Sequence, residues 1–285
     1  MSANTSSFKD ELPISGKTTQ YDSNLPVFSI ITVVWNCQNT IEKTIQSIIG
    51  QTYPNIEYII IDGNSTDKTI DIIKQYKNHI ALWISEPDKG IYDAMNKGIK
   101  LAQGNYINFM NAGDVFADDR ILSKIADTGL LNAADVIFGD FIAVDEDSKM
   151  DRMIKAKPLS KLWKGAIASH QSVFVNSDII KKNLFDTKLD IAADYKQLLT
   201  LQQQGYVFQY IPQVITKTSI DGISYSNPKT ILEQFEVFRA MYPHSIRQIY
   251  FIKLLITSKI KRVLGTKILK MLRKIKWKLY AMFQK

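Results

Sequence analysis

The sequence predicts an α/β fold with a mixed, mainly parallel sheet flanked by helices. Apolar runs without a breaker alternate with segments whose apolar residues recur at helical spacing, and the links between them are short. Continuous rather than alternating apolarity is typical of strands buried on both faces, as in a parallel sheet. Regular alternation of such strands with helices indicates βαβ units.

The elements can be assigned in order from residue 27. VFSIITVVW (27–35) predicts the first strand, and Asn39 or Thr40 can cap a helix that ends near Gly50. The remaining segments are IEYIIID (a strand), GNST (a turn), residues from about 67 to 76 (a helix), ALWISE (a strand), KGIYDAMNKGIKLA (a helix) and NYINFMN (a strand). Four buried strands with crossing helices make the core of the predicted domain.

Polar side chains follow each of these four strands. They are Asn36, Asp62, Glu86 with Asp88, and Asn111 with Asp114. Ligands of open α/β sheets bind beyond the carboxyl ends of the strands, so this edge is the expected site. The alternative is that Asp and Asn simply favour turns and caps.

Composition excludes several protein classes. Of the 285 residues, 45% are apolar and 11% aromatic, which excludes a mostly disordered chain. No run of 18 apolar residues occurs, and the polar N-terminus has no core of the signal-peptide type, so we expect a cytoplasmic protein. The single cysteine, Cys37, excludes an intrachain disulfide framework.

Charge divides the chain into a mildly acidic body and a basic C-terminal segment. The net charge is +8, but residues 247–285 hold 12 Lys or Arg and no Asp or Glu, so the remainder has a net charge of −4. Apolar residues in this segment recur at helical spacing, and Trp277 and Tyr280 suit lipid headgroups. A basic amphipathic helix favours an anionic membrane surface. Packing on the body and nucleic-acid binding are the alternatives, and the second lacks a nucleic-acid module.

We therefore expect three parts. Residues 1–24 form a flexible arm, residues 25–225 the α/β domain, and residues 226–285 a basic, helical, membrane-associating extension.

Three motifs of the body resemble glycosyltransferase family 2, whose fold is called GT-A. The matching segments are SIITVVWN, QTYPNIEYIIIDGNSTDKT and SEPDKGIYDAMNKGIKLAQGNYINFMNAGD, followed more weakly by SHQSVF and IAADYKQLL. The similarity is greatest to the branch that builds bacterial surface polysaccharides. It implies a Rossmann-like GT-A domain that binds a nucleotide sugar.

The resemblance and the residue types together suggest a nucleotide-sugar site. Asp62 matches the family's nucleobase-binding Asp, and Asn36 with the backbone of Thr32 to Val34 borders the same cleft. Ser65 and Thr66 are better explained as a helix cap. Asp88 can position the nucleotide and Lys89 can meet phosphate charge, unless EPDKG is only a solvated turn. The resemblance places Asn96 near the nucleotide, although exposed helical Asn is common.

NAGD stands where the family usually has an Asp-x-Asp metal motif. Asn111 replaces the first Asp and Gly113 the next expected acid, so only Asp114 remains to bind a divalent cation. Mg²⁺ and Mn²⁺ prefer oxygen ligands, and Mg²⁺ keeps several waters, so one carboxylate with phosphate oxygens can hold it. Asn111 would contact ribose or a metal-bound water.

The resemblance also suggests the base and the acceptor side. Asp194 matches the family's general base at the start of a helix, with Asp190 a possible substitute and a simple N-cap the alternative. His170 and Gln171 match a loop near the acceptor, but a structural histidine is an equal alternative. An inverting transferase is therefore expected, with a nucleotide-sugar donor (a UDP-sugar favoured), a lipid-linked saccharide acceptor, and a place on the inner face of the cytoplasmic membrane. A nucleotidyltransferase and a non-catalytic scaffold with a degenerate domain are the rival hypotheses.

Overall fold

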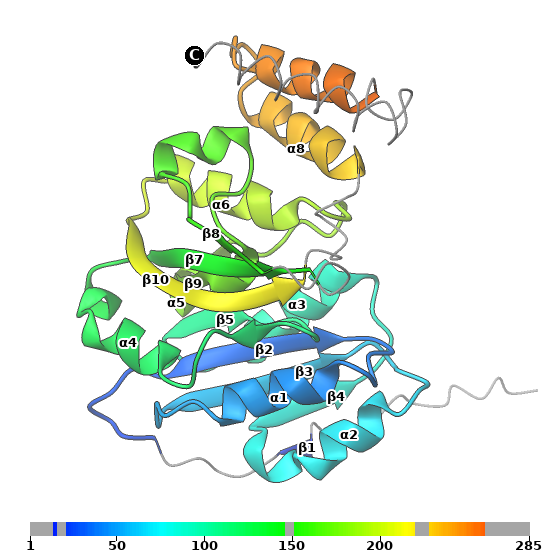
Figure 1. Ribbon diagram of the computed structural model, residues 1–285, viewed down its shortest axis with the longest axis vertical. Helices are drawn as coiled ribbons and strands as arrows, with labels where there is room; N and C mark the ends of the chain where they lie inside the picture. Colours follow the sequence, from blue (N-terminus) through cyan, green and yellow to red (C-terminus); the bar gives the residue numbers. More distant parts are fainter. Residues whose placement is uncertain (1–13, 16–20, 146–150, 220–227, 260–285) are drawn as a thin grey trace, which may run out of the picture.

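The computed structural model describes residues 14–15, 21–145, 151–219 and 228–259, whose strands form one ten-stranded mixed sheet (Figure 1). The strands are β1 (Ile14–Ser15), β2 (Phe28–Val34), β3 (Ile56–Asp62), β4 (Leu82–Ser85), β5 (Tyr106–Phe109), β6 (Val115–Phe116), β7 (Val136–Val144), β8 (Arg152–Ile154), β9 (Val173–Asn176) and β10 (Phe208–Ser219). Their order is β1-β4-β3-β2-β5-β9-β7-β10-β6, with β8 beside β7.

The parallel part of the sheet holds the four predicted strands. β4, β3, β2 and β5 run parallel, as do β7 and β10, whereas the pairings β1–β4, β5–β9, β7–β9, β7–β8 and β6–β10 are antiparallel. The carboxyl ends of β2 to β5 therefore lie along one edge of the sheet. This confirms the predicted mixed, mainly parallel architecture.

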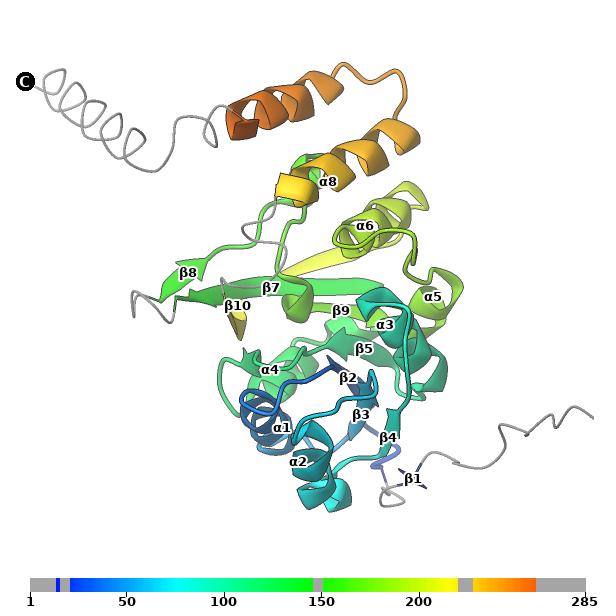
Figure 2. The same ribbon diagram turned by 90° about the vertical axis from the view of Figure 1, so that its right-hand side faces the viewer.

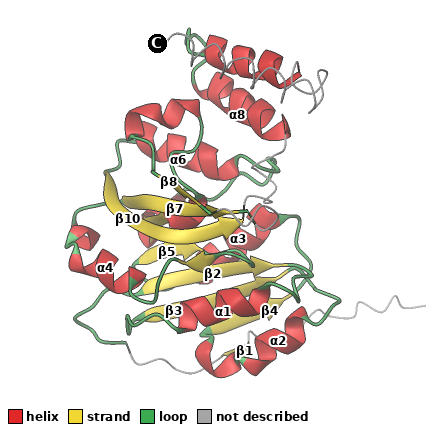
Figure 3. Ribbon diagram, in the orientation of Figure 1, coloured by secondary structure: helices red, strands yellow, loops and turns green. Residues whose placement is uncertain are grey.

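Helices cover both faces of the sheet (Figure 3). They are α1 (Ile41–Ile49), α2 (Thr69–Gln75), α3 (Ile91–Leu101), α4 (Ile121–Asp127), α5 (Ser177–Lys182), α6 (Ala193–Gln203) and α8 (Pro228–Met241), with a further helix over 248–259. Short 3₁₀ helices cover Lys77–His79, Leu130–Asn132, Leu159–Lys164 and His170–Ser172.

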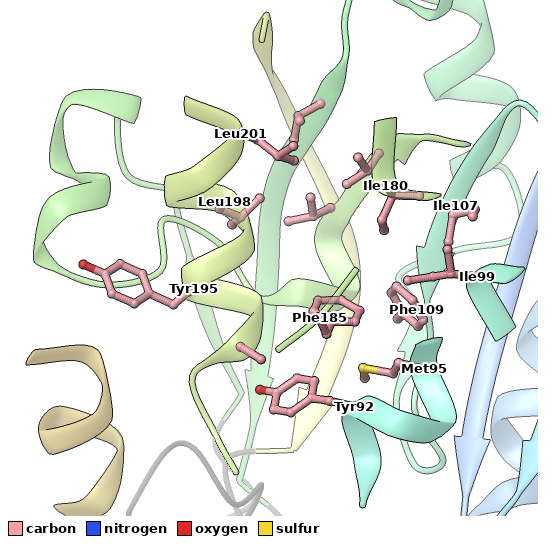
Figure 4. Close-up of a cluster of buried hydrophobic side chains, with 14 of the residues drawn as sticks. Tyr92, Met95, Ile99, Ile107, Phe109, Ile180, Phe185, Tyr195, Leu198 and Leu201 are labelled. Atoms are coloured by element: carbon pink, nitrogen blue, oxygen red, sulfur yellow. The ribbon is translucent and has the colours of Figure 1, made fainter. Parts of the chain in front are cut away.

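The unbroken apolar strands are explained by two cores, one on each face. In β2, Ile30 and Val34 belong to the core that α1, α2 and α4 cover, whereas Ile31 and Val33 belong to the core under α3, α5 and α6. Figure 4 shows the second core, where Tyr92, Met95 and Ile99 of α3 meet side chains of β5, α5 and α6. Since successive strand residues point to opposite faces, burial on both faces favours apolar residues at consecutive positions.

Local details differ from the sequence-based expectations. Helix α1 begins at Ile41 without a side-chain cap from Thr40. Ser65 does not cap α2, because that helix begins only at Thr69 and the Ser65 hydroxyl accepts from the N–H of Asn36 instead. Within the predicted N-terminal arm, Ile14–Ser15 pairs with β4, and Asp22 is held by the side-chain amide of Asn55.

The C-terminal segment begins as a helix that packs on α8 (Figure 2). Phe251 of the 248–259 helix is fully buried and stacks on Phe235 of α8, with 5.8 Å between ring centroids. One side of this helix therefore packs on the rest of the protein, as one of the alternatives expected. Trp277 and Tyr280, which were predicted to lie at lipid headgroups, are outside the described residues. None of the described helices combines the length and the apolar character that crossing a bilayer requires.

Candidate functional site

Asn36 joins the loops that follow β2 and β3. Its backbone adopts a left-handed conformation with φ of 50°, its N–H donates to the hydroxyl of Ser65 at 2.8 Å, and its Oδ1 accepts from the N–H of Thr66 at 2.8 Å. Two further bonds, from Cys37 N to Thr69 Oγ1 and from Gln38 N to Asp67 Oδ2, join the same loops. These loops therefore form one rigid wall at the carboxyl edge of the sheet.

Asp62 organises this wall from within. Its buried carboxylate accepts hydrogen bonds from the N–H of Ser65 at 2.9 Å, from the Ser65 hydroxyl at 2.5 Å and from the Ser85 hydroxyl at 2.6 Å. An ionised carboxylate offers about four acceptor sites. Three of the four are used by the chain itself, and Asp62 has no exposed surface in this structure.

Asp88 lies against the turn after β3. Its Oδ1 accepts from the N–H of Gly90 at 2.8 Å, and its Oδ2 would lie 2.6 Å from a Cβ added at Gly63. Only glycine at position 63 lets the carboxylate approach so closely. Lys89 is exposed, and its backbone N–H donates to Asp93.

Three of the residues predicted to bind the nucleotide have side chains that are used elsewhere in the fold. The amide of Asn96 bonds both backbone groups of Phe185, its Nδ2 to the carbonyl and its Oδ1 to the N–H, each at 2.9 Å. Asn96 is buried and holds α3 to the segment before α6, so it does not join the other predicted residues. Thr32 is also buried, and its hydroxyl bonds the carbonyl of Met110. The side chain of Val34 is buried in the core that α1 covers. At Val34, therefore, only the backbone lies at the carboxyl edge of the sheet.

A second group of predicted residues meets at the end of β5. Asn111 Nδ2 lies 3.0 Å from His170 Nε2, and His170 Nδ1 lies 3.9 Å from Asp194 Oδ2. The other oxygen of Asp194 accepts from the N–H of Tyr195 at 2.7 Å and lies 3.5 Å from the hydroxyl of Tyr92. The side chains of His170 and Asp194 keep 26% and 25% of their surface exposed, enough for a ligand to reach them.

Burial shifts the pKa values of Asp194 and His170. It raises the pKa of Asp194, an effect that the neighbouring His170 and the Tyr195 N–H oppose. Burial also lowers the pKa of His170, while Asp194 favours its charged form. A cavity of about 20 Å³, walled mainly by apolar side chains such as Phe109 and Leu198, adjoins both groups. A carboxylate with a raised pKa is a stronger proton acceptor, as a general base requires.

Asp114 and Gln171 form the neighbouring contact. Gln171 Nε2 donates to Asp114 Oδ2 at 2.5 Å, and the N–H of Ser219 donates to Oδ1 at 3.3 Å. Burial raises the pKa of Asp114 to about 6, although these bonds and the charge of Lys43 lower it. His170 and Gln171 thus contact the two polar residues of NAGD, one each.

The backbone conformation at position 113 explains why glycine stands there in place of an acidic residue. Its φ is +103°, a conformation that residues with a Cβ rarely adopt. Asn111 Oδ1 is buried and has no hydrogen-bond partner in the part of the chain that the structure describes. Among the described residues, no group of three or more His, Cys, Asp or Glu side chains is placed to hold a metal ion.

The structure adds two residues that the motifs did not suggest. Tyr92 of α3 donates its hydroxyl to the carbonyl of Ile191 at 2.6 Å, just before α6. Glu233 of α8 accepts hydrogen bonds from the N–H groups of Ile191 and Ala192. Asp190 instead pairs with Lys229 at the surface. In the sequence, the position of Tyr92 within a helical segment is only a weak sign of a role in the site. Glu233 shows no such sign, because it lies far along the chain from the motifs.

Comparisons with known proteins identify the family of the chain. A family model described as "Glycosyl transferase family 2" matches residues 29–188. An uncharacterized glycosyltransferase of Mycobacterium tuberculosis is 31% identical over 182 residues, covering 62% of this chain and 69% of the relative. The Escherichia coli UDP-Glc:alpha-D-GlcNAc-diphosphoundecaprenol beta-1,3-glucosyltransferase WfaP is 39% identical over 102 residues, covering 35% of this chain and 41% of WfaP.

Solved structures show the same fold at low sequence identity. TarS of S. aureus, in complex with UDP-GlcNAc, aligns with a TM-score of 0.60 at 16% identity, covering 80% of this chain and 70% of TarS. The mannosyltransferase of Pyrobaculum calidifontis, in complex with GDP-Man and Mn²⁺, aligns with a TM-score of 0.61 at 16% identity, covering 90% of this chain and 81% of that one.

Proposed function

Since the chain belongs to glycosyltransferase family 2 and has the GT-A fold, we propose that it transfers sugar, with inversion, from a UDP-sugar to a lipid-linked saccharide. That it is a glycosyltransferase with a nucleotide-sugar donor follows from the family. One observation supports the finer proposal most strongly, namely the meeting of Asp194, His170 and Asn111 beside Asp114 at one edge of the sheet.

Asp194 is the proposed base. The acceptor hydroxyl gives its proton to the Asp194 carboxylate, its oxygen attacks the anomeric carbon, and the bond to the nucleoside diphosphate breaks. The raised pKa of Asp194 and its partial exposure both support this role. The alternative in which Asp194 is only an N-cap has less support, because the cap position of α6 is Ala192 and Asp194 lies inside the first turn.

Donor binding is assigned to the wall made by the loops after β2, β3 and β4. The base and ribose are proposed to be recognised by the backbone near Val34 and by the side chains of Asn36 and Asp88, on loops that the buried Asp62 carboxylate holds in place. The exposed ammonium group of Lys89 is proposed to meet phosphate charge. A UDP-sugar is favoured because WfaP uses UDP-Glc and TarS binds UDP-GlcNAc.

A divalent cation fits the oxygen atoms of Asp114 and Asn111 if phosphate and water supply most of its ligands. Asp114 supplies a hard carboxylate oxygen, and the buried Oδ1 of Asn111, which has no hydrogen-bond partner among the described residues, lies in the same motif. Mg²⁺ binds in this way, through one or two carboxylates together with phosphate oxygens and water. Asp114 would hold the ion, whose charge would neutralise the leaving diphosphate.

The acceptor is proposed to lie at an anionic membrane, where the C-terminal helices dock. Ile246, Ile249, Ile252 and Ile256 are exposed on the outer side of the 248–259 helix and its start. Arg247, Lys253 and Lys259 lie among them and are also exposed. Exposed apolar and basic residues on one amphipathic helix fit an anionic bilayer surface. WfaP, whose acceptor is diphosphoundecaprenol-linked, supports a lipid-linked acceptor.

A two-stage assay tests the proposal. Thermal stabilisation by UDP-, GDP- and dTDP-sugars, with Mn²⁺ or with EDTA, identifies the donor. Transfer from that donor to an α-GlcNAc-diphospho-lipid in anionic vesicles is then followed by release of nucleoside diphosphate and by the anomeric configuration of the product. We expect an inverted linkage, and a retained configuration would contradict the mechanism.

A further inference from the structure

Glu233 of α8 reaches the segment that carries the proposed base. Its Oε2 accepts from the N–H of Ile191 at 2.9 Å and from that of Ala192 at 3.1 Å, and its Oε1 lies 3.4 Å from the N–H of Asp190. The side chain is buried. A carboxylate at this position satisfies donors at the start of α6 that have no partner within the helix.

The same residue, Ile191, is held from its other side by α3. The Tyr92 hydroxyl donates to the Ile191 carbonyl at 2.6 Å and lies 3.5 Å from Asp194 Oδ1. Glu233 and Tyr92 therefore fix both backbone polar groups of Ile191, three residues before Asp194. The backbone at the start of α6 cannot turn without breaking one of these contacts.

Helix α8 is itself firmly attached to the domain and to the 248–259 helix (Figure 2). Val237 and Phe238 are buried, the ring of Phe238 lies 6.2 Å from that of Trp163, and Phe251 packs 5.2 Å from Phe238 between ring centroids. Glu233 thus stands on a helix whose position depends on the 248–259 helix.

From these contacts we infer that Glu233 is a positioning residue for Asp194, so that α8 belongs to the catalytic unit rather than to a separate anchor. This inference rests on the proposed role of Asp194. Loss of the Glu233 acceptor frees the N–H groups of Ile191 and Ala192, and the Asp194 carboxylate then leaves its place beside His170. Substrate binding by the loops after β2 to β4 does not depend on this contact.

Variants of the full-length protein, assayed in the vesicle transfer reaction, test the inference. Glu233→Ala is expected to lower kcat about 10- to 100-fold, the cost of misplacing a reacting group by about 1 Å, with the donor KM changed by less than about twofold. Glu233→Gln keeps a carbonyl acceptor and is expected to restore most of kcat. Glu236→Ala, which removes an exposed carboxylate three residues along α8, is the matched control and is expected to behave as wild type.

Hydrogen exchange supplies a readout that does not depend on substrate. Amides 190–192 are expected to exchange faster in Glu233→Ala but not in Glu236→Ala. If Glu233→Ala fails to fold, Glu233→Asp, which shortens the reach by one methylene, takes its place with the same expectation. Faster exchange at 190–192 with a wild-type kcat would overturn the inference.

Asp194→Asn separates this inference from the proposed function. If Asp194→Asn loses turnover while Glu233→Ala keeps it, only the role of Glu233 is wrong. If Asp194→Asn keeps full turnover, the proposed base is wrong and the inference falls with it.

Discussion

Asp62 offers a prediction whose size can be worked from its contacts. Asp62→Ala removes the acceptor of three hydrogen bonds, from the Ser65 N–H and from the hydroxyls of Ser65 and Ser85. The hydroxyls can turn to other partners, but the Ser65 N–H cannot. Losing charge-assisted bonds of about 1.5–3 kcal/mol, partly offset by this rotation, gives a destabilisation of about 3 kcal/mol. At about 2–4 °C per kcal/mol, Tm falls by about 6–12 °C.

The assay combines calorimetric unfolding with titration of UDP. Because Asp62 organises the loop wall, Asp62→Ala is also expected to weaken UDP binding by about 10- to 150-fold. Ser85→Ala is the matched control, because the one hydrogen bond of its hydroxyl goes to Asp62 Oδ2 in the described part of the chain. It removes one hydroxyl and leaves the Asp62 carboxylate in place, so a loss of only about 1 kcal/mol is expected. An unchanged Tm together with unchanged UDP affinity in Asp62→Ala would refute the reasoning.

Three further predictions follow from other parts of the molecule. Because burial raises the pKa of Asp114 to about 6 from its ordinary 3.8, the folded chain keeps a proton that the unfolded chain loses between these values. The contribution of Asp114 to the free energy of unfolding therefore falls as pH rises through this window. In the presence of EDTA, Asp114→Asn should raise Tm at neutral pH but not at about pH 4. An equal shift of Tm at both pH values would contradict this prediction. Gly113→Asp places a side chain at φ of +103° and should lower the free energy of unfolding by about 1–3 kcal/mol. Calorimetry should also show that this variant binds Mn²⁺ no more tightly than the wild type. Tighter Mn²⁺ binding without loss of stability would contradict the prediction. Ile252→Glu changes an exposed residue and should reduce flotation with anionic vesicles while Tm stays unchanged. Phe251→Ala, at the buried neighbour, should instead lower the free energy of unfolding by about 3–5 kcal/mol. Unchanged flotation of Ile252→Glu would show that this face does not contact the membrane.

Much of the fold could be predicted because its strands are buried on both faces. The strand Ile56–Asp62 was predicted at its observed bounds, since β-branched residues without a breaker signal a central parallel strand. The packing of α8 and the 248–259 helix was harder to foresee. The spacing of Ile249, Ile252 and Ile256 predicts an amphipathic helix, but it does not reveal that Phe251 on another side is buried.

The site could be predicted in part. Asn111, Asp114, His170, Gln171 and Asp194 were each predicted from motifs, and the fold brings them together. The buried side chain of Asn96 could not be recognised, because helical spacing does not indicate that a distant backbone at Phe185 takes both of its amide groups.

Contacts supplied from far along the chain escaped prediction for the same reason. Glu233 lies 42 residues after Ile191 in the sequence, and no local pattern marks it as the partner of that backbone. Truncation near Pro243 is expected to unfold α8 in part, because it removes the buried ring of Phe251.

Turnover of Asp194→Asn tests the central claim most directly. The substitution keeps the size of the side chain and its contact with the Tyr195 N–H but removes the proton acceptor. We predict that the donor Kd, measured by titration, stays within about twofold of wild type while kcat in the vesicle transfer assay falls about 10²- to 10⁴-fold. Asp190→Asn, at the surface beside Lys229, serves as the control and should keep its turnover. Full turnover in Asp194→Asn, with turnover lost in Asp190→Asn, would contradict the account.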